Sequence, residues 1–253
     1  MSIVRTPMLK RQTLQFVFRL LVFFIALGFY LLDKEHMFQL ATQPIHLGIN
    51  FLHILWAIFM IMMLAHLFPN GRLPMAMRKS CPQNYAEVKD YREIDLLRFV
   101  QQQNLRAWTV MLVWLFVNGV IGLLYLMDIL DNADLLMLTV FYYLCDYICI
   151  LFFCPFQTGI MKNKCCVNCR IYDWGHFMMF TPMLFIRDFF SWSLFFTSAV
   201  VLIHWEVIYA KHPERFWSGS NKTLQCAHCQ DKTCQYKRAI TRAVTRKEGP
   251  HYD

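Results

Sequence analysis

Long apolar runs alternate with short polar stretches along this chain, and the pattern predicts membrane-crossing helices. Runs with almost no charged residues cover positions 14–32, 46–68, 107–129 and 135–154. Each is close to the roughly 20 residues that an α-helix needs to cross the hydrocarbon core of a bilayer. We therefore predict an all-α membrane protein, folded as a multi-pass helical bundle.

The last apolar region, residues 171–209, differs because charged residues interrupt it at Arg187 and Asp188. One interpretation is a single span over 189–209, preceded by a segment at the membrane interface. The other is a tilted hairpin with a short first arm, 171–186, and its charged turn at the far side of the bilayer. We favour the hairpin, so the bundle should contain about five main membrane segments, the last of them a short hairpin.

Composition supports the membrane class and argues against nucleic acid as a partner. Hydrophobic residues make up 57% of the chain and charged residues only 17%, whereas soluble domains have about 25% charged residues. The net charge is +8, but the basic residues lie between the apolar runs and are not interleaved with aromatic residues. We expect the lipid bilayer as the partner. Other membrane or cytoplasmic subunits are partners that the sequence leaves open.

The distribution of Lys and Arg predicts the topology. These residues are concentrated in the N-terminal tail, in residues 69–106 and 155–170, and in the C-terminal tail, while the turn at 128–134 has none. The positive-inside rule places the basic segments, and hence both termini, in the cytoplasm. A hairpin over 171–209 satisfies this rule for the C-terminal tail, whereas a single span would not.

Residues 85–106 mix apolar and charged positions without Gly or Pro, which predicts an amphipathic helix on the cytoplasmic surface. The chain then divides into six consecutive parts. The first three are an N-terminal tail with the first two spans (1–68), a cytoplasmic amphipathic loop (69–106) and two further spans (107–154). The last three are a cysteine-containing loop (155–170), the interrupted membrane segment (171–209) and a basic cysteine-containing tail (210–253).

Ten cysteines give the strongest chemical signal. Two C-x-x-C pairs, Cys166 with Cys169 and Cys226 with Cys229, stand on either side of the last apolar region. A C-x-x-C turn places two thiolates on one side of a tight loop, and two such turns can surround one metal ion. The hairpin would bring both pairs to the cytoplasmic face. We therefore predict a small cysteine-rich cap in which these residues bind one metal.

Zinc is the preferred metal, because a tetrahedral shell of thiolates suits a structural zinc site. Cys165, Cys234 and Cys154 are possible extra ligands, more than one zinc needs. An iron–sulfur cluster that transfers electrons is therefore the alternative. Thiol redox chemistry, or cysteines without any ligand role, is the third interpretation.

Polar residues at membrane depth are the second signal. Asp146 lies in the middle of the fourth apolar run, and an intramembrane carboxylate should face the bundle interior with a partner. His53 and Asn118, from neighbouring spans, are the predicted partners. Arg19, one turn inside the first span, is expected to reach the membrane interface instead.

Haem is disfavoured, because His66 and His204 lie near the ends of apolar runs and not at matched depths inside them. The sequence has no Walker-type loop, G-x-S-x-G or H-E-x-x-H motif, so whether the protein is an enzyme stays open. We expect a non-catalytic membrane subunit with structural zinc. The alternatives are a redox protein with an iron–sulfur or haem centre and, ranked lower, a transporter that uses Asp146 and His53.

Overall fold

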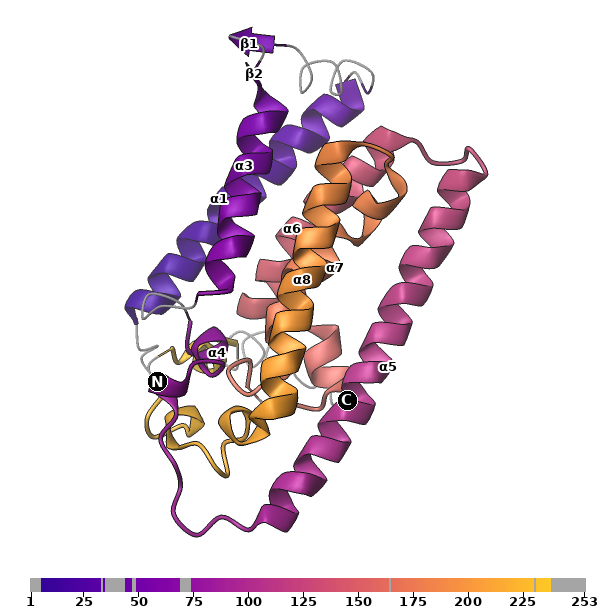
Figure 1. Ribbon diagram of the computed structural model, residues 1–253. Coiled ribbons are helices and arrows are strands. Elements are labelled where there is room, and N and C mark those ends of the chain that lie inside the picture. Colours follow the sequence, from indigo (N-terminus) through magenta and orange to yellow (C-terminus); the bar gives the residue numbers. More distant parts are fainter. Residues whose placement is uncertain are drawn as a thin grey trace, which may run out of the picture.

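The fold was obtained as a computed structural model that describes residues 6–32, 34, 44–46, 49–68, 74–163, 165–229 and 231–237. Within these residues, four helices are long and apolar enough to cross a membrane. They are α1 (Pro7–Leu32), α5 (Glu93–Leu126), α6 (Asn132–Leu151) and α8 (Phe189–Lys211) (Figure 1). This confirms a helical, multi-pass membrane protein, while the number of crossings stays a prediction.

The second predicted span forms a shorter helix. Residues Pro44–His46 (β1) and Ile49–Asn50 (β2) pair as antiparallel strands, and α3 (Phe51–His66) begins directly after them. Its 16 residues extend roughly 24 Å at 1.5 Å per residue, which is slightly less than the hydrocarbon thickness of a typical bilayer.

The amphipathic segment and the third span are one continuous helix. We predicted a separate surface helix over 85–106, but α5 begins at Glu93 and runs 34 residues without a break. Glu93 and Asp95 in its first turn favour this start, because acidic side chains stabilise a helix N-terminus. The preceding residues are extended, since Val88 N–H donates to the carbonyl of Ser220. The tail therefore binds the part of the chain that we expected to be helical.

The interrupted region is buried in the bundle and runs antiparallel to α8. It consists of the short helices η3 (Tyr172–Trp174), α7 (Gly175–Phe180) and η4 (Thr181–Phe185). Trp205 Nε1 donates to the carbonyl of Arg170 at the start of this segment, and Trp192 Nε1 donates to the carbonyl of Leu184 near its end. Asp188 then caps α8 by accepting hydrogen bonds from the backbone N–H groups that follow it. This course matches the predicted hairpin with its charged turn; whether both arms cross a membrane stays a prediction.

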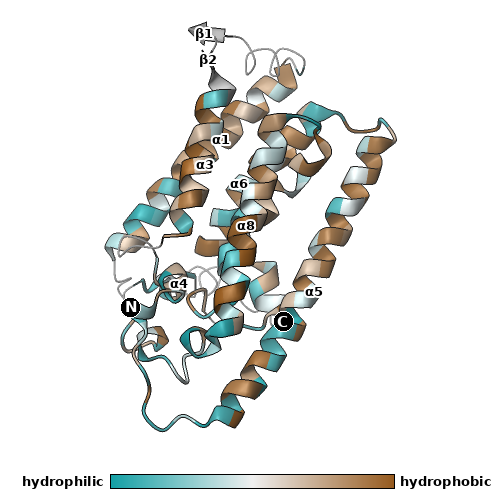
Figure 2. Cartoon of the chain, viewed as in Figure 1, coloured by the Kyte–Doolittle hydropathy of each residue, from teal (hydrophilic) through white to brown (hydrophobic). Residues whose placement is uncertain are grey.

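Four basic segments meet at one end of the bundle, which we call the cysteine end: residues 6–12, 74–92, 152–170 and 212–237, with the described gaps. Thr6 Oγ1 donates to the carbonyl of Asp231, and Met75 N–H donates to the Asp231 carboxylate. Short helices occupy this end: α4 (Met75–Arg78), η1 (Pro82–Asn84), η2 (Phe156–Ile160), η5 (Pro213–Phe216) and η6 (Lys222–Leu224). Figure 2 shows hydrophilic residues gathered here, below the apolar helices. Because the four segments meet, they lie at the same end of the molecule, in agreement with the predicted topology. Which side of a membrane they face stays a prediction.

Candidate functional site

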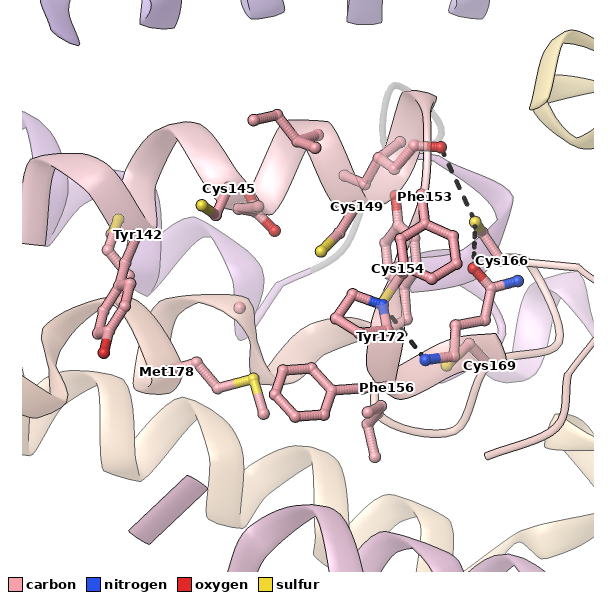
Figure 3. A pocket seen from close by; sticks show the side chains of 18 of the residues that line it. Tyr142, Cys145, Cys149, Phe153, Cys154, Phe156, Cys166, Cys169, Tyr172 and Met178 are labelled. Atoms are coloured by element: carbon pink, nitrogen blue, oxygen red, sulfur yellow. Dashed lines mark hydrogen bonds between the residues drawn. The ribbon is translucent and has the colours of Figure 1, made fainter. Parts of the chain in front are cut away.

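A cavity of about 410 Å³ lies between α6, the chain after it and the first arm of the hairpin (Figure 3). Its walls are almost entirely apolar or sulfur-bearing. The lining residues are Trp114, Phe141, Tyr142, Cys145, Asp146, Ile148, Cys149, Ile150, Phe153, Cys154, Pro155, Phe156, Gln157, Cys166, Cys169, Ile171, Tyr172, Gly175, Met178 and Met179. Thiols are thus concentrated in a cavity that the membrane part of the molecule forms.

One face of α6 supplies the polar part of the wall. Tyr142, Cys145, Asp146 and Cys149 follow the spacing i, i+3, i+4 and i+7, which places them along one side of a helix. The helix begins at a capping box in which Asp131 and Asp134 bond to each other's backbone N–H groups. This fixed start sets the rotation of the helix and therefore the direction of the stripe.

Cys149 and Cys154 form a thiol pair at the end of α6. Both side chains line the cavity and lie beside each other in Figure 3, although one lies in the helix and the other after its end. The backbone N–H of Gln157 donates to Cys154 Sγ at 3.4 Å, because the chain turns back after Pro155. Figure 3 shows both sulfurs beside the cavity, opposite the ring of Phe156. Two neighbouring thiols can be joined by a disulfide.

The surroundings of Cys154 favour its thiolate. Its pKa is lowered to about 7, with the neighbouring Cys149 thiol as the largest cause. Burial acts in the opposite direction, while the N–H of Gln157 and the ammonium of Lys237 lower the pKa further. Thiolates are the reactive form of cysteine, so Cys154 is the better nucleophile of the pair near neutral pH.

The C-terminal tail closes the same end of the cavity through Lys237. Its Nζ lies 3.0 Å from Cys166 Sγ and 3.0 Å from Gln157 Oε1, and it also donates to the carbonyl of Cys149. Cys166 Sγ in turn lies 3.1 Å from Gln157 Oε1. One lysine therefore links the tail to α6, to the turn after it and to the first C-x-x-C pair.

The predicted metal quartet is not assembled. All ten cysteines lie in the described residues, and each is a thiol outside any disulfide. Cys166 and Cys169 are buried, whereas Cys226 is exposed and Cys229 packs beside Leu224. Among the described residues, no group of three His, Cys, Asp or Glu side chains is arranged to hold a metal. The zinc and iron–sulfur hypotheses therefore gain no support from this arrangement and stay predictions.

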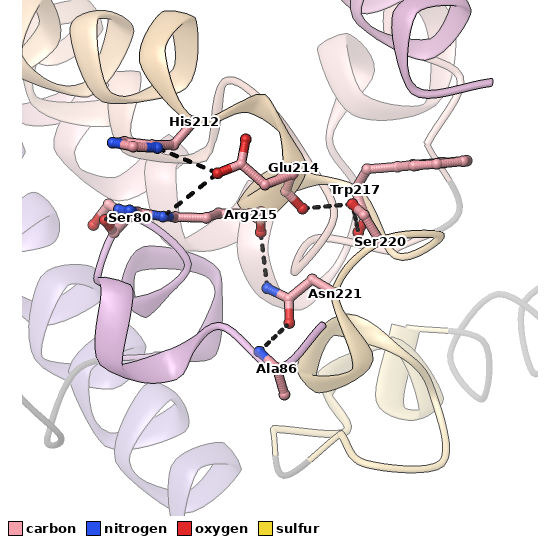
Figure 4. A network of polar contacts seen from close by, with 8 residues as sticks. All are labelled: Ser80, Ala86, His212, Glu214, Arg215, Trp217, Ser220 and Asn221. Carbon is pink, nitrogen blue, oxygen red and sulfur yellow. Dashed lines mark hydrogen bonds and ion pairs between the residues drawn. The ribbon is translucent and has the colours of Figure 1, made fainter. Parts of the chain in front are cut away.

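Hydrogen bonds hold the tail where we expected zinc to do so (Figure 4). Asn221 is fully buried; its Nδ2 donates to the carbonyl of Arg215 at 2.9 Å, and its Oδ1 accepts from Ala86 N–H. Arg215 Nη1 donates to the carbonyl of Ser80 at 3.2 Å. The loop and the tail thus meet, as the hairpin hypothesis requires, without the four sulfurs meeting.

Lys79 lies next to the candidate site, and the sequence alone did not indicate this. Its ammonium is buried and donates to the carbonyls of Val167 and Cys169, at 2.9 and 2.5 Å. Burial lowers the pKa of Lys79 to about 8. The side chain fixes the turn that carries Cys166 and Cys169, and no pattern near residue 79 signals this burial.

Asp146 has a different partner from the two that we predicted. Arg19 Nη1 lies 2.8 Å from Asp146 Oδ2, and the guanidinium lies over the ring of Tyr143 at 3.9 Å. Arg19 is only 9% exposed, because Asp146 and the rings of Tyr143 and Tyr147 surround its guanidinium. His53 instead contacts the ring of Phe190. Asn118, the other predicted partner, donates to the carbonyl of Trp114.

The remaining histidines give no haem-like arrangement within the described part of the chain. His66 and His176 contact each other directly, with ring centroids 4.6 Å apart, and His66 Nδ1 lies 3.4 Å from Asp173 Oδ1. Two rings in contact leave no room for a haem between them.

Comparison with protein families, with curated protein sequences and with solved structures finds no match to this chain. The proposed function therefore rests on the residues that line the cavity.

Proposed function

We propose that the protein is a membrane thiol–disulfide redox protein whose reactive pair is Cys149 and Cys154. The observation that carries the proposal is that these two thiols lie beside each other on the wall of one apolar cavity. Two adjacent thiols can release two electrons and two protons and form one S–S bond, as in other dithiol redox sites.

The two cysteines have different roles in this reaction. Cys154 is the attacking thiolate, because the N–H of Gln157 and the ammonium of Lys237 stabilise negative charge on its sulfur. Cys149 is the resolving thiol, since its side chain lies beside Cys154 on the wall of the same cavity. After Cys154 has formed a bond with an oxidant, Cys149 attacks the Cys154 sulfur, and the reduced oxidant leaves. Reduction of the S–S bond restores both thiols.

Controlled oxidation tests the pair. The purified protein in lipid nanodiscs is fully reduced, oxidised anaerobically with diamide, alkylated and digested, and disulfide-linked peptides are identified by mass spectrometry. We expect one dominant link, between Cys149 and Cys154. It should vanish in Cys149→Ser and Cys154→Ser and persist in the control Cys145→Ser, which removes another thiol from the same helix face. If Cys149 and Cys154 are both alkylated after oxidation of the wild type, the proposal fails.

Structural zinc is the second candidate, and one observation favours it. Cys165 and Cys229 pack against the same small apolar cluster, and Cys165 is hydrogen-bonded to Cys234, so thiols from the loop and the tail do come together. Metal analysis of protein purified without chelators separates the candidates. Stoichiometric zinc that is lost in Cys229→Ser supports the structural site. Its absence, with the tail still protected from proteases, leaves the hydrogen bonds of Asn221 as the tail's anchor.

A further inference from the structure

We infer that the cavity beside Cys149 and Cys154 binds a lipid-soluble quinone, which accepts the electrons of the dithiol. This inference rests on the proposed redox function and names the oxidant. It follows from where the cavity lies, from the shape of its walls and from the number of electrons that the thiol pair can release.

Two of the residues that line the cavity present large apolar side chains on the outside of the bundle. Phe141 and Phe153 line it and are 44% and 60% exposed, although both are large apolar residues. Phe141 belongs to α6, and Phe153 lies two residues after its end. The exposed faces of both therefore meet hydrocarbon if α6 crosses the membrane. A ligand that enters between them comes from the lipid phase and must itself be apolar.

The walls suit a flat ring. Trp114, Tyr142 and Phe156 form an aromatic group, with ring centroids 4.8 Å apart for Trp114 and Tyr142 and 5.9 Å apart for Trp114 and Phe156. Aromatic side chains favour stacked or edge-on contacts with a planar ligand. The volume of about 410 Å³ falls within the range of roughly 300–1,000 Å³ that is usual for small-molecule sites. In Figure 3, Phe156 and Met178 lie across the cavity from Cys149. A quinone ring would lie between these two side chains and the Cys149 thiol.

The chemistry of the pair selects a two-electron acceptor. The Cys154 thiolate adds to an electrophilic ring carbon of the quinone, and the ring takes up the electron pair. Cys149 then attacks the Cys154 sulfur: the S–S bond forms, the S–C bond breaks, and its electrons leave with the ring. The two thiol protons end on the two hydroquinone oxygens, so atoms and electrons balance without another reactant. A lipid acyl chain, the other occupant that an apolar cavity could take, accepts no electrons and would leave both thiols without a role.

The test uses reduced full-length protein in nanodiscs of quinone-free phosphatidylcholine, kept anaerobic, with a decyl-substituted benzoquinone as the probe. Loss of quinone absorbance and formation of the Cys149–Cys154 link are followed together. We expect one quinone to be reduced for each link formed, and no reduction by Cys149→Ser or Cys154→Ser. Cys81→Ser removes a thiol that does not line the cavity and should behave as the wild type.

A cavity-filling variant locates the reaction. Met178→Trp should slow quinone reduction by about a hundredfold, the order of loss expected when a reactant is displaced from its position. Leu112→Trp is the matched control, because Leu112 is exposed on α5 and does not line the cavity. Diamide should still join Cys149 to Cys154 in Met178→Trp, which shows that this variant is folded.

The outcomes distinguish the two proposals. If diamide forms the link but the benzoquinone is not reduced, the quinone inference fails and the redox function stands. Equal rates for Met178→Trp and the wild type also overturn the inference, because the quinone then reacts outside the cavity. If neither oxidant forms the link, both proposals fail.

Discussion

Cys154 differs from the other thiols of the cavity in its position after the end of α6, where the backbone N–H of Gln157 donates to its sulfur and the charge of Lys237 lowers its pKa further. Cys166, by contrast, has its pKa raised, mainly by burial. The same lysine thus lies near two thiols, and only one of them has a lowered pKa. At the scale of single residues, the balance between burial and hydrogen bonding decides which thiol is reactive.

This balance predicts a pH profile. The alkylation rate of Cys154 by a neutral reagent should rise as the pH rises through about 7, because the thiolate is the reacting form and the pKa of Cys154 is about 7. Lys237→Gln should move the midpoint to higher pH, since it removes a positive charge that favours the thiolate. Lys222→Gln, at an exposed position of the tail, is the control and should leave the midpoint unchanged. Peptide-resolved alkylation rates measure this; an unshifted midpoint in Lys237→Gln contradicts it.

The pair of Arg19 and Asp146 predicts strong coupling between two helices. Asp146→Leu and Arg19→Met should each destabilise the fold by about 1–3 kcal/mol, because each leaves its partner's charge without a counter-charge inside the bundle. The double variant Arg19→Met with Asp146→Leu should recover most of the loss. Denaturant titration in mixed micelles gives the free energies for a double-mutant cycle. Additive losses in the cycle would show that the pair is not coupled.

Among the elements, the first arm of the hairpin depends on a close approach to α5. A Cβ atom added at Gly122 would lie 2.2 Å from the ring of Phe185 in η4, whereas one added at Gly119 would meet nothing within 4 Å. The two glycines are one turn apart on the same helix. Gly122 therefore marks the place where the irregular first arm of the hairpin packs against the regular helix α5.

Gly122→Ala should destabilise the protein by about 1–3 kcal/mol, the usual cost of overpacking. Gly119→Ala, the matched control, should be neutral or stabilising by up to about 1 kcal/mol, because Ala has the higher helix propensity. Thermal unfolding of both variants in the same detergent measures the difference. Similar melting temperatures for the two would mean that η4 does not pack against Gly122.

For the whole molecule, the meeting of basic segments at the cysteine end predicts sidedness. Cysteine reporters replace, one at a time, the exposed residues Lys162, Lys222 and Asn132 in a Cys226→Ser background, which removes the exposed native thiol. An impermeant thiol reagent applied to intact cells should label the reporter at Asn132 and reach the other two only after permeabilisation, by the positive-inside rule. Different accessibility at Lys162 and Lys222 would contradict a hairpin between them.

The apolar pattern predicts the long helices well, because lipid-facing and buried positions on a membrane helix are both apolar. It cannot predict that α1 packs on α6, which brings Arg19 to Asp146. Likewise, C-x-x-C spacing identifies residues with the right chemistry, but tertiary packing decides that Cys166 lies by Lys237 and that Cys154 lies by Cys149. The useful sequence signal was the group of Cys145, Asp146 and Cys149 on one helix face, close to Cys154.

The contact between Thr6 and Asp231 has a consequence for how the protein is made. These residues are 225 positions apart in sequence, and Thr6 Oγ1 donates to the carbonyl of Asp231. At about 5–20 residues per second, roughly 11–45 s separate their synthesis. During that interval the first helices are in the membrane, but the tail, whose Lys237 contacts residues of the cavity wall, has not yet been made. The thiols of the cavity are therefore open to oxidation until residues 231–237 have been made and have packed against them.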